Sequence, residues 1–172
     1  MPTGASYIYD RRVFCKTMKV LVAYYTRTGN TGKVAAELAN ALAADTETIV
    51  DKKGRKGPLG YLASGRDSTK KIPAQIDDPK KDPSWYDLVV VGTPVWAWSV
   101  STPVLAYLQK YAGKFPEIAF FLTYDGNMEK TFPEMATAAG RQPKATLAVL
   151  SKEVKSGAFV QQAKDFAAKL TS

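Results

Sequence analysis

Residues 18–42 read MKVLVAYYTRTGNTGKVAAELANAL, and the rest of the chain is organised around this stretch. It begins with an apolar run at 20–25 that is long enough for a buried strand. Small and hydroxyl residues follow at 26–32, and apolar residues then recur every three or four positions from Val34 to Leu42, which indicates an amphipathic helix. The N-terminus of such a helix presents unpaired backbone N–H groups and the positive end of the helix dipole. With three threonine hydroxyls beside it, the loop predicts a phosphate-binding site.

The length and composition indicate one globular domain. The chain has 172 residues, of which 45% are hydrophobic and 23% are charged, enough for one full core and short for two. No apolar run approaches the roughly 20 residues that a membrane helix needs. We therefore expect a single domain over residues 18–172. Residues 1–17 show neither helical nor strand periodicity and are expected to be a disordered extension.

The net charge of +8 is concentrated in two places. Between Asp51 and Lys71 there are seven basic residues against two acidic ones, and residues 1–17 hold three against one. A local concentration favours the attraction of an acidic partner, so the region from Lys52 to Lys71 is a candidate docking site. A solvated loop without a partner explains the same pattern. Nucleic acid is not expected, because Tyr61 is the one aromatic residue among these basic residues.

The composition also excludes several kinds of catalytic and metal site. The chain has no histidine, which excludes Ser–His–Asp and Cys–His catalysis and histidine metal sites. A single cysteine, Cys15, excludes an internal disulfide and gives no sign of an oxidising compartment. Residues 10–16 resemble a twin-arginine export signal, but the apolar stretch behind them is the first core strand, so we expect a cytoplasmic protein. A bound cofactor is then the simplest source of chemistry.

Strand-like and helix-like segments alternate along the rest of the chain. Apolar runs predict four further strands, at residues 46–50, 88–91, 118–122 and 145–150. The segments between them predict helices, including one near residues 59–68. Five strands alternating with five helical segments predict a parallel sheet with helices on both faces. The loops at the carboxyl ends of such strands converge on one site; here they are residues 26–31, 93–101 and 123–127.

Three of the later helices carry start or stop signals. Thr102 is predicted to cap one helix, and residues 131–134 have the spacing of a capping box for a helix that ends at Gly140. Ser156 can cap a last helix. The residues of that last helix predicted to point inward are Phe159, Ala163, Phe166, Ala167 and Leu170.

Two common phosphate motifs do not match the loop at 26–32. A Walker A loop has the pattern G-x4-G-K-[ST], but here the first glycine is missing and Lys33 is followed by Val34. The dinucleotide pattern G-x-G-x-x-G also fails, because only Gly29 and Gly32 occur. What remains is a hydroxyl-rich loop suited to a single dianionic phosphate.

Two motifs resemble those of the flavodoxin family. Residues 26–31 (TRTGNT), which follow the first strand, resemble the phosphate loop of that family. Residues 86–96 (YDLVVVGTPVW) resemble its third strand and flavin-contacting loop. The similarity runs from about Met18 to the C-terminus and is to the short-chain form. It implies a three-layer α/β fold with a doubly wound, five-stranded parallel sheet in the order 2-1-3-4-5.

The resemblance also implies the cofactor, FMN, and its site. The FMN phosphate would lie in the first of the three loops, and the isoalloxazine ring between the second and the third. A planar flavin needs aromatic walls, for which Trp96, Trp98 and Tyr124 are available. The cofactor-binding residues expected on this basis are Thr26, Arg27, Thr28, Gly29, Asn30, Thr31, Thr93, Pro94, Val95, Trp96, Ala97, Trp98, Thr123, Tyr124, Asp125 and Gly126.

Three functions agree with this interpretation. The leading one is an FMN-binding electron carrier that exchanges electrons with redox partner proteins and needs no catalytic side chain or metal. The alternative is an NAD(P)H-dependent FMN oxidoreductase of quinones or other small acceptors, whose nicotinamide phosphates would be attracted by the region from Lys52 to Lys71. A third is a module that binds a phosphate ligand without redox function.

Overall fold

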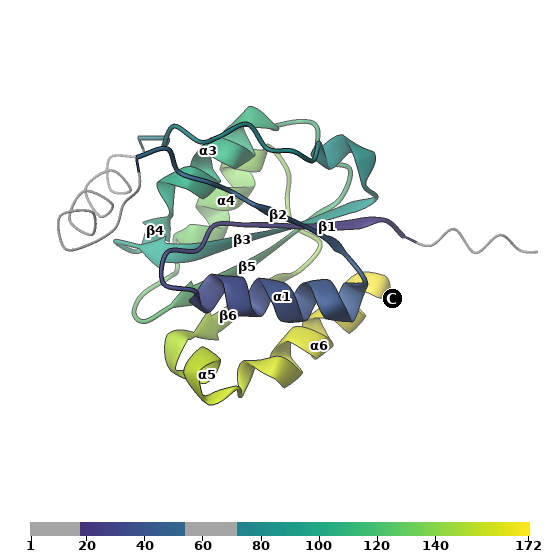
Figure 1. Ribbon diagram of the computed structural model, residues 1–172, viewed down its shortest axis with the longest axis vertical. Coiled ribbons are helices and arrows are strands. Elements are labelled where there is room, and N and C mark those ends of the chain that lie inside the picture. The colour runs from purple at the N-terminus through teal and green to yellow at the C-terminus, as the bar shows by residue number, and fades with distance from the viewer. Residues whose placement is uncertain (1–17, 54–71) are drawn as a thin grey trace, which may run out of the picture.

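The computed structural model describes residues 18–53 and 72–172, and it consists of a sheet between two layers of helices (Figure 1). The predicted extension at 1–17 and the predicted helix near 59–68 lie outside the described residues, as does most of the basic region from Lys52 to Lys71. The order of strands predicted from the sequence is confirmed.

The parallel strands are arranged in the order β2-β1-β3-β5-β6, and a short strand, β4, pairs antiparallel with the end of β3. If β4 is left out and the five parallel strands are numbered along the chain, this is the predicted order 2-1-3-4-5. The strands are β1 (Val20–Tyr24), β2 (Asp45–Thr48), β3 (Leu88–Trp96), β4 (Ser99–Val100), β5 (Ile118–Tyr124) and β6 (Thr146–Leu150). The helices are α1 (Asn30–Leu42), α3 (Thr102–Lys110), α4 (Thr131–Ala139), α5 (Ser151–Ser156) and α6 (Phe159–Thr171), and η1 (Pro83–Trp85) is a 3-10 turn.

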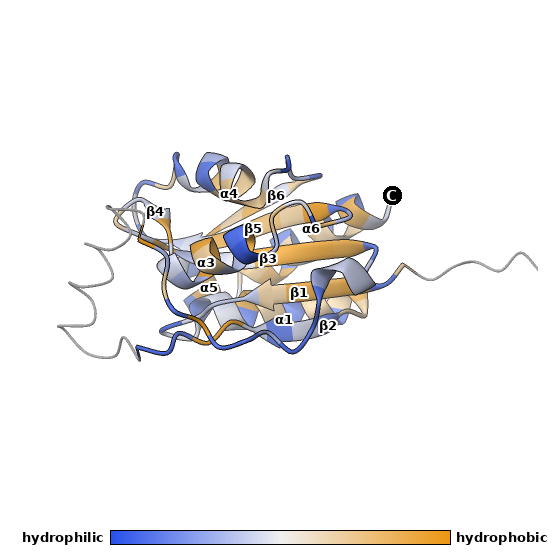
Figure 2. Ribbon diagram, turned by 90° about the horizontal axis from the view of Figure 1, so that it is seen from above, coloured by the Kyte–Doolittle hydropathy of each residue, from blue (hydrophilic) through white to orange (hydrophobic). Residues whose placement is uncertain are grey.

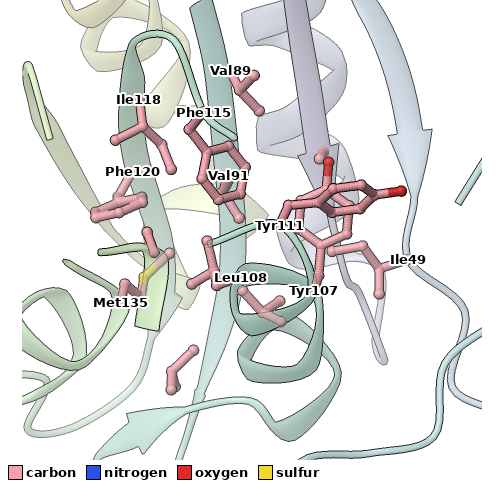
Figure 3. Packing of buried hydrophobic residues seen from close by; sticks show 14 of the residues in the cluster. Ile49, Val89, Val91, Tyr107, Leu108, Tyr111, Phe115, Ile118, Phe120 and Met135 are labelled. Carbon is pink, nitrogen blue, oxygen red and sulfur yellow. The ribbon is translucent and has the colours of Figure 1, made fainter. Parts of the chain in front are cut away.

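The central strands are apolar on both faces, so each face of the sheet has its own core (Figure 2). Val90 of β3 belongs to the core formed with α1, α5 and α6. Its neighbour Val91 belongs to the core formed with α3 and α4. On that second side Leu108 of α3 and Met135 of α4 pack toward the sheet (Figure 3).

Strand β3 is longer than the predicted segment 88–91, because it continues through the residues that were expected to form a loop. Gly92 and Pro94 weaken a strand prediction, but the fold requires the first and tolerates the second. A Cβ on Gly92 would lie 2.0 Å from a ring carbon of Phe121. Strand β1 pairs with β3 only as far as Gly92, whereas Pro94 pairs with β5 alone, so its missing N–H disrupts no ladder on the β1 side.

The other predicted boundaries of strands and helices differ less from those in the structure. Strand β2 covers Asp45–Thr48 rather than 46–50, and α5 follows β6 without a loop, where no helix was predicted. Ser156 ends α5, and the residue before α6 is Ala158, although the Ser156 hydroxyl does accept from the Ala158 N–H at 3.5 Å. The five residues of α6 predicted to point inward are all buried.

Two predicted helix caps are wrong. Thr102 is the first residue of α3 rather than its cap, which is Ser101. Helix α4 begins at Thr131 after Lys130, and no side chain caps it, although it does end at Gly140 as expected. The predicted capping box fails because the Glu134 carboxylate bonds to β4 instead of to the start of its own helix.

Candidate functional site

The loop at 26–31 joins the carboxyl end of β1 to the N-terminus of α1. Gly29 has φ +92°, a conformation that residues with a Cβ rarely adopt, and this turns the chain into the helix. The Gly29 N–H donates to the Thr26 hydroxyl at 3.1 Å, and the Lys33 N–H donates to the Gly29 carbonyl at 3.0 Å. Asn30 and Thr31 lie in the first turn of α1, where backbone N–H groups have no intrahelical acceptor. The loop therefore directs N–H donors and the helix dipole at one place.

The side chains of this loop differ in their exposure. Thr28 is exposed, whereas Thr26 and Asn30 are half-buried. A Cβ on Gly32 would lie 3.3 Å from the Thr26 methyl group, so the first turn of α1 packs closely on the loop. Of the three threonines in this loop, Thr28 is thus the most accessible to a ligand.

A buried hydrogen bond ties this loop to the third predicted loop. The hydroxyls of Thr31 and Thr123 are 2.8 Å apart, and both residues are buried. Thr123 lies near the end of β5, and it is followed by half-buried Tyr124 and by exposed Asp125 and Gly126. The Thr31 hydroxyl is therefore bonded to β5, and the start of α1 is held beside residues 123–126.

The second predicted loop is a β-hairpin. Val95 pairs with Val100 and Trp96 with Ser99, so Ala97 and Trp98 form a two-residue turn. Both turn residues have positive φ, +46° and +62°. Two-residue hairpin turns with positive φ at both positions normally contain Asn and Gly. The expectation of a loop over residues 93–101 is therefore wrong, because most of this segment forms the end of β3, a tight turn and β4.

Hydrogen bonds hold the hairpin at both ends of β4. At one end the Ser101 N–H donates to the buried Thr93 hydroxyl at 3.1 Å, and the two side-chain oxygens are 2.9 Å apart. At the other end the Glu134 carboxylate of α4 accepts from the Ser99 hydroxyl and from the Val100 N–H, the latter at 3.3 Å. Two elements distant in the sequence therefore fix the position of the turn.

The three aromatic side chains predicted to contact a ring have different environments. Trp96 is 6% exposed and packs edge-on against Tyr25, with ring centroids 5.4 Å apart and an interplanar angle of 89°. The Arg27 guanidinium lies 5.7 Å from the Trp96 ring centroid, so this tryptophan links the first loop to the hairpin. Trp98 is 67% exposed, and Tyr124 is half-buried. Trp98 and Tyr124 are thus the more accessible pair.

The three predicted loops lie at one edge of the sheet. The Thr31–Thr123 bond joins the first to the third, the Arg27–Trp96 contact joins the first to the hairpin, and the pairing of Pro94 with Thr123 joins the hairpin to the third. This is the carboxyl edge of the parallel strands, where α/β sheets bind their ligands.

A separate groove of about 590 Å³ lies between α3 and α4, behind the hairpin. Apolar and polar side chains from both helices line it, among them Glu134 of α4, and Val100 of β4 contributes as well. Its volume is in the range of small-molecule sites. This groove was not predicted from the sequence, because its two walls come from separate helices.

Several residues that shape the site were missed in the sequence. Glu134 was interpreted as part of a helix cap, and Ser99 and Ser101 were interpreted only as loop residues. Their roles depend on contacts between elements that are about 35 and 8 residues apart in the chain. The spacing of residue types carries no signal for such contacts.

The described part of the chain contains neither a metal-binding cluster nor a helix able to span a membrane. Over residues 18–53 and 72–172, no three Cys, Asp or Glu side chains gather where they could hold a metal ion. None of the helices in the same residues has the length and apolar character needed to cross a bilayer.

Comparison with known proteins identifies the family. Residues 19–148 match the family model described as flavodoxin. A flavoprotein from Lactobacillus acidophilus, solved in complex with FMN, is 24% identical with a TM-score of 0.68, over 81% of this chain and 97% of that one. A flavoprotein from Bacteroides uniformis is 19% identical with the same TM-score, over 82% and 97%. A flavodoxin from the domain Archaea is 15% identical with a TM-score of 0.53, over 90% and 100%. No curated protein matches the chain. The resemblance found in the sequence is confirmed, and the protein belongs to the flavodoxin family.

Proposed function

We propose that this protein binds FMN at the carboxyl edge of the sheet and acts as an electron carrier. One observation carries the proposal: the loop at 26–31, the β3–β4 hairpin and residues 123–126 meet at this edge. The Thr31–Thr123 hydrogen bond joins the first to the third, and the pairing of Pro94 with Thr123 joins the hairpin to the third. Membership of the flavodoxin family supports it, as does the FMN held by the similar Lactobacillus acidophilus protein.

The loop at 26–31 would hold the phosphate. Its donors are the backbone N–H groups at the start of α1 and the exposed Thr28 hydroxyl. The Thr31 hydroxyl would contribute indirectly, because it is bonded to Thr123 and holds the start of the helix in place. A phosphate dianion at a helix N-terminus is also stabilised by the helix dipole.

The hairpin and residues 123–126 would border the isoalloxazine ring. Trp98 and Tyr124 are the accessible aromatic side chains and would cover the ring and exclude water from it. Trp96 would support the hairpin from the core side, since it packs on Tyr25. When bound, the flavin supplies the redox chemistry, and the protein binds and orients it.

The groove between α3 and α4 favours a second candidate, an NAD(P)H-dependent oxidoreductase of small acceptors. Val100 and Glu134 place one end of the groove directly behind the hairpin, and its volume of about 590 Å³ suits a small molecule. Steady-state oxidation of NADPH with a quinone separates the two candidates, because a carrier shows almost no turnover.

We further propose a cytoplasmic location and redox partners that are proteins or small acceptors. An acidic partner would suit the basic region from Lys52 to Lys71, and Lys52 and Lys53 are its exposed members within the described residues. Nucleic acid is not proposed as a partner.

The test is the absorption spectrum of the purified protein, followed by titration of the apoprotein with FMN and with riboflavin. We expect a yellow protein that releases FMN on denaturation. Thr28→Ala should weaken FMN binding about tenfold and leave riboflavin binding unchanged, since one hydrogen bond to a charged group is lost. Thr171→Ala, at the exposed end of α6, is the matched control. A colourless protein that binds inorganic phosphate but neither flavin would contradict the proposal and favour the phosphate-binding module.

A further inference from the structure

The turn of the β3–β4 hairpin is unfavourable for the residues that form it. Ala97 and Trp98 both lie in the left-handed region of φ, where a Cβ approaches the backbone too closely. Neither residue is a glycine or asparagine, which would relieve this crowding. Backbone of this kind persists when the surrounding structure fixes it, and it is concentrated at functional sites.

Glu134 is well placed to fix this turn. Its carboxylate accepts from the Ser99 hydroxyl and from the Val100 N–H, so one side chain binds both residues of β4. Ser99 directly follows the turn and pairs with Trp96 across the hairpin. Bonds of this kind to a charged acceptor are stronger than those between neutral groups.

The carboxylate is itself held in place by the packing of its helix. Glu134 lies in the first turn of α4 and is half-buried, and its neighbours Met135 and Ala136 belong to the core between the sheet and helices α3 and α4. Figure 3 shows Met135 in this core. The helix therefore acts as a rigid support. At the other end of β4 the Thr93–Ser101 contact provides a second anchor.

We infer that Glu134 is a positioning residue of the flavin site. It holds the β3–β4 hairpin in one conformation, so that Trp98 is presented at the carboxyl edge of the sheet before a ligand arrives. The part of this inference that concerns the ring depends on the proposed function, whereas the part that concerns the hairpin does not. A preorganised hairpin removes the cost of ordering it on binding.

The first test is hydrogen exchange of the backbone amides of residues 95–101 in the apoprotein. Glu134→Leu removes the acceptor at similar volume and should raise their exchange rate about ten- to hundredfold. Glu134→Gln keeps one acceptor oxygen and should restore most of the protection. Glu129→Leu is the matched control, because Glu129 is an exposed carboxylate on the same side of the groove. Unchanged exchange in Glu134→Leu would overturn the inference.

The second test is the affinity of the same variants for FMN and for riboflavin. The hairpin borders the ring rather than the phosphate, so Glu134→Leu should weaken both ligands by the same factor, about tenfold. Thr28→Ala should weaken FMN alone. A loss confined to FMN, or no loss in either ligand, would overturn the positioning role.

The two tests separate the inference from the function on which it depends. If the unmodified protein binds no flavin, the proposed function fails, and the exchange experiment still decides whether Glu134 holds the hairpin. Should Glu134→Leu not fold, Ser99→Ala removes one of the two donors and leaves the core intact. Ser99→Ala is expected to raise exchange in the same segment by a smaller factor, and unchanged exchange in it would count against the inference.

Discussion

The loop at 26–31 and the β3–β4 hairpin border the same edge of the sheet, but they are held in different ways. The loop is shaped mainly by short-range bonds, such as those between Gly29 and Thr26 and between Lys33 and Gly29. The hairpin depends on Glu134, which lies 35 residues from Ser99 in the sequence. The difference is a division of roles, in which local structure shapes the proposed phosphate site and tertiary contacts position the hairpin proposed to border the ring.

The largest expected effect is at Gly92, a residue of β3 that is connected to both regions. Its carbonyl accepts from the Tyr25 N–H at 3.2 Å on the side of the loop, and β3 continues from it into the hairpin. Gly92→Ala places a Cβ 2.0 Å from the Phe121 ring in a core without space. We expect a loss of about 3 kcal/mol or more in the free energy of unfolding, measured with urea.

Gly126→Ala is the matched control for this change, because a Cβ at Gly126 has no heavy atom within 4 Å. We expect a change within about 0.5 kcal/mol. A stability loss in Gly92→Ala no larger than that in Gly126→Ala would show that the core around Gly92 can accommodate the extra carbon.

The next largest effect is expected at the Thr31–Thr123 hydrogen bond, which joins the loop at 26–31 to β5. Thr31→Val leaves the buried Thr123 hydroxyl without its partner, and we expect a loss of about 1–3 kcal/mol in the free energy of unfolding. The double variant with Thr123→Val removes both hydroxyls and should recover part of this loss. Additive effects of the two substitutions in urea unfolding would mean that the hydrogen bond contributes no coupling energy.

Trp98→Ala should separate binding from folding. The side chain is 67% exposed, so the free energy of unfolding should change by less than about 0.5 kcal/mol. Flavin affinity should fall by about 1–3 kcal/mol for both FMN and riboflavin, because a stacked aromatic ring is lost.

Trp85→Ala provides the comparison for Trp98, since Trp85 is also exposed, at 63%, but precedes the amino end of β3. Its removal should change neither flavin affinity nor stability, as measured by fluorescence titration and urea unfolding. Equal affinity losses in the two variants would indicate a general surface effect and would exclude a specific role for Trp98.

The smallest effect is expected at the turn itself. Ala97→Gly removes the crowding at φ +46° and should stabilise the fold by up to about 1 kcal/mol, part of which the flexibility of glycine offsets in the unfolded chain. Ala43→Gly, at φ +48° after α1, should give a similar gain far from the hairpin. If thermal unfolding shows a loss for Ala97→Gly and a gain for Ala43→Gly, the hairpin is not under the strain described.

The fold was largely predictable because its signals are local. The continuous apolar runs at 88–91 and 118–122 predicted strands buried on both faces, and the spacing of apolar residues placed α1 and α6. The loop between β1 and α1 could be located because strand, small residues and helix follow one another directly. The order of the strands then followed from the family resemblance.

The hairpin was not predictable, for a physical reason. Gly92 and Pro94 normally end a strand, but here the ring of Phe121 needs the space that a glycine leaves. Glu134 stands three residues after Thr131, the spacing of a capping box, and its carboxylate instead contacts β4. Both outcomes are decided by neighbours in space, which the order of residues does not reveal.

The Thr31–Thr123 hydrogen bond also has a consequence for how the protein is made. The two residues are 92 positions apart, so the ribosome completes the loop at 26–31 long before it reaches the strand that holds it. As the chain emerges, β2 pairs on one side of β1, and β3, β5 and β6 then add in turn on the other side. A nascent chain that ends before Thr123 lacks both this hydrogen bond and one wall of the proposed flavin site. Loading of the cofactor is therefore expected to be a late event in biosynthesis, after most of the domain has left the ribosome.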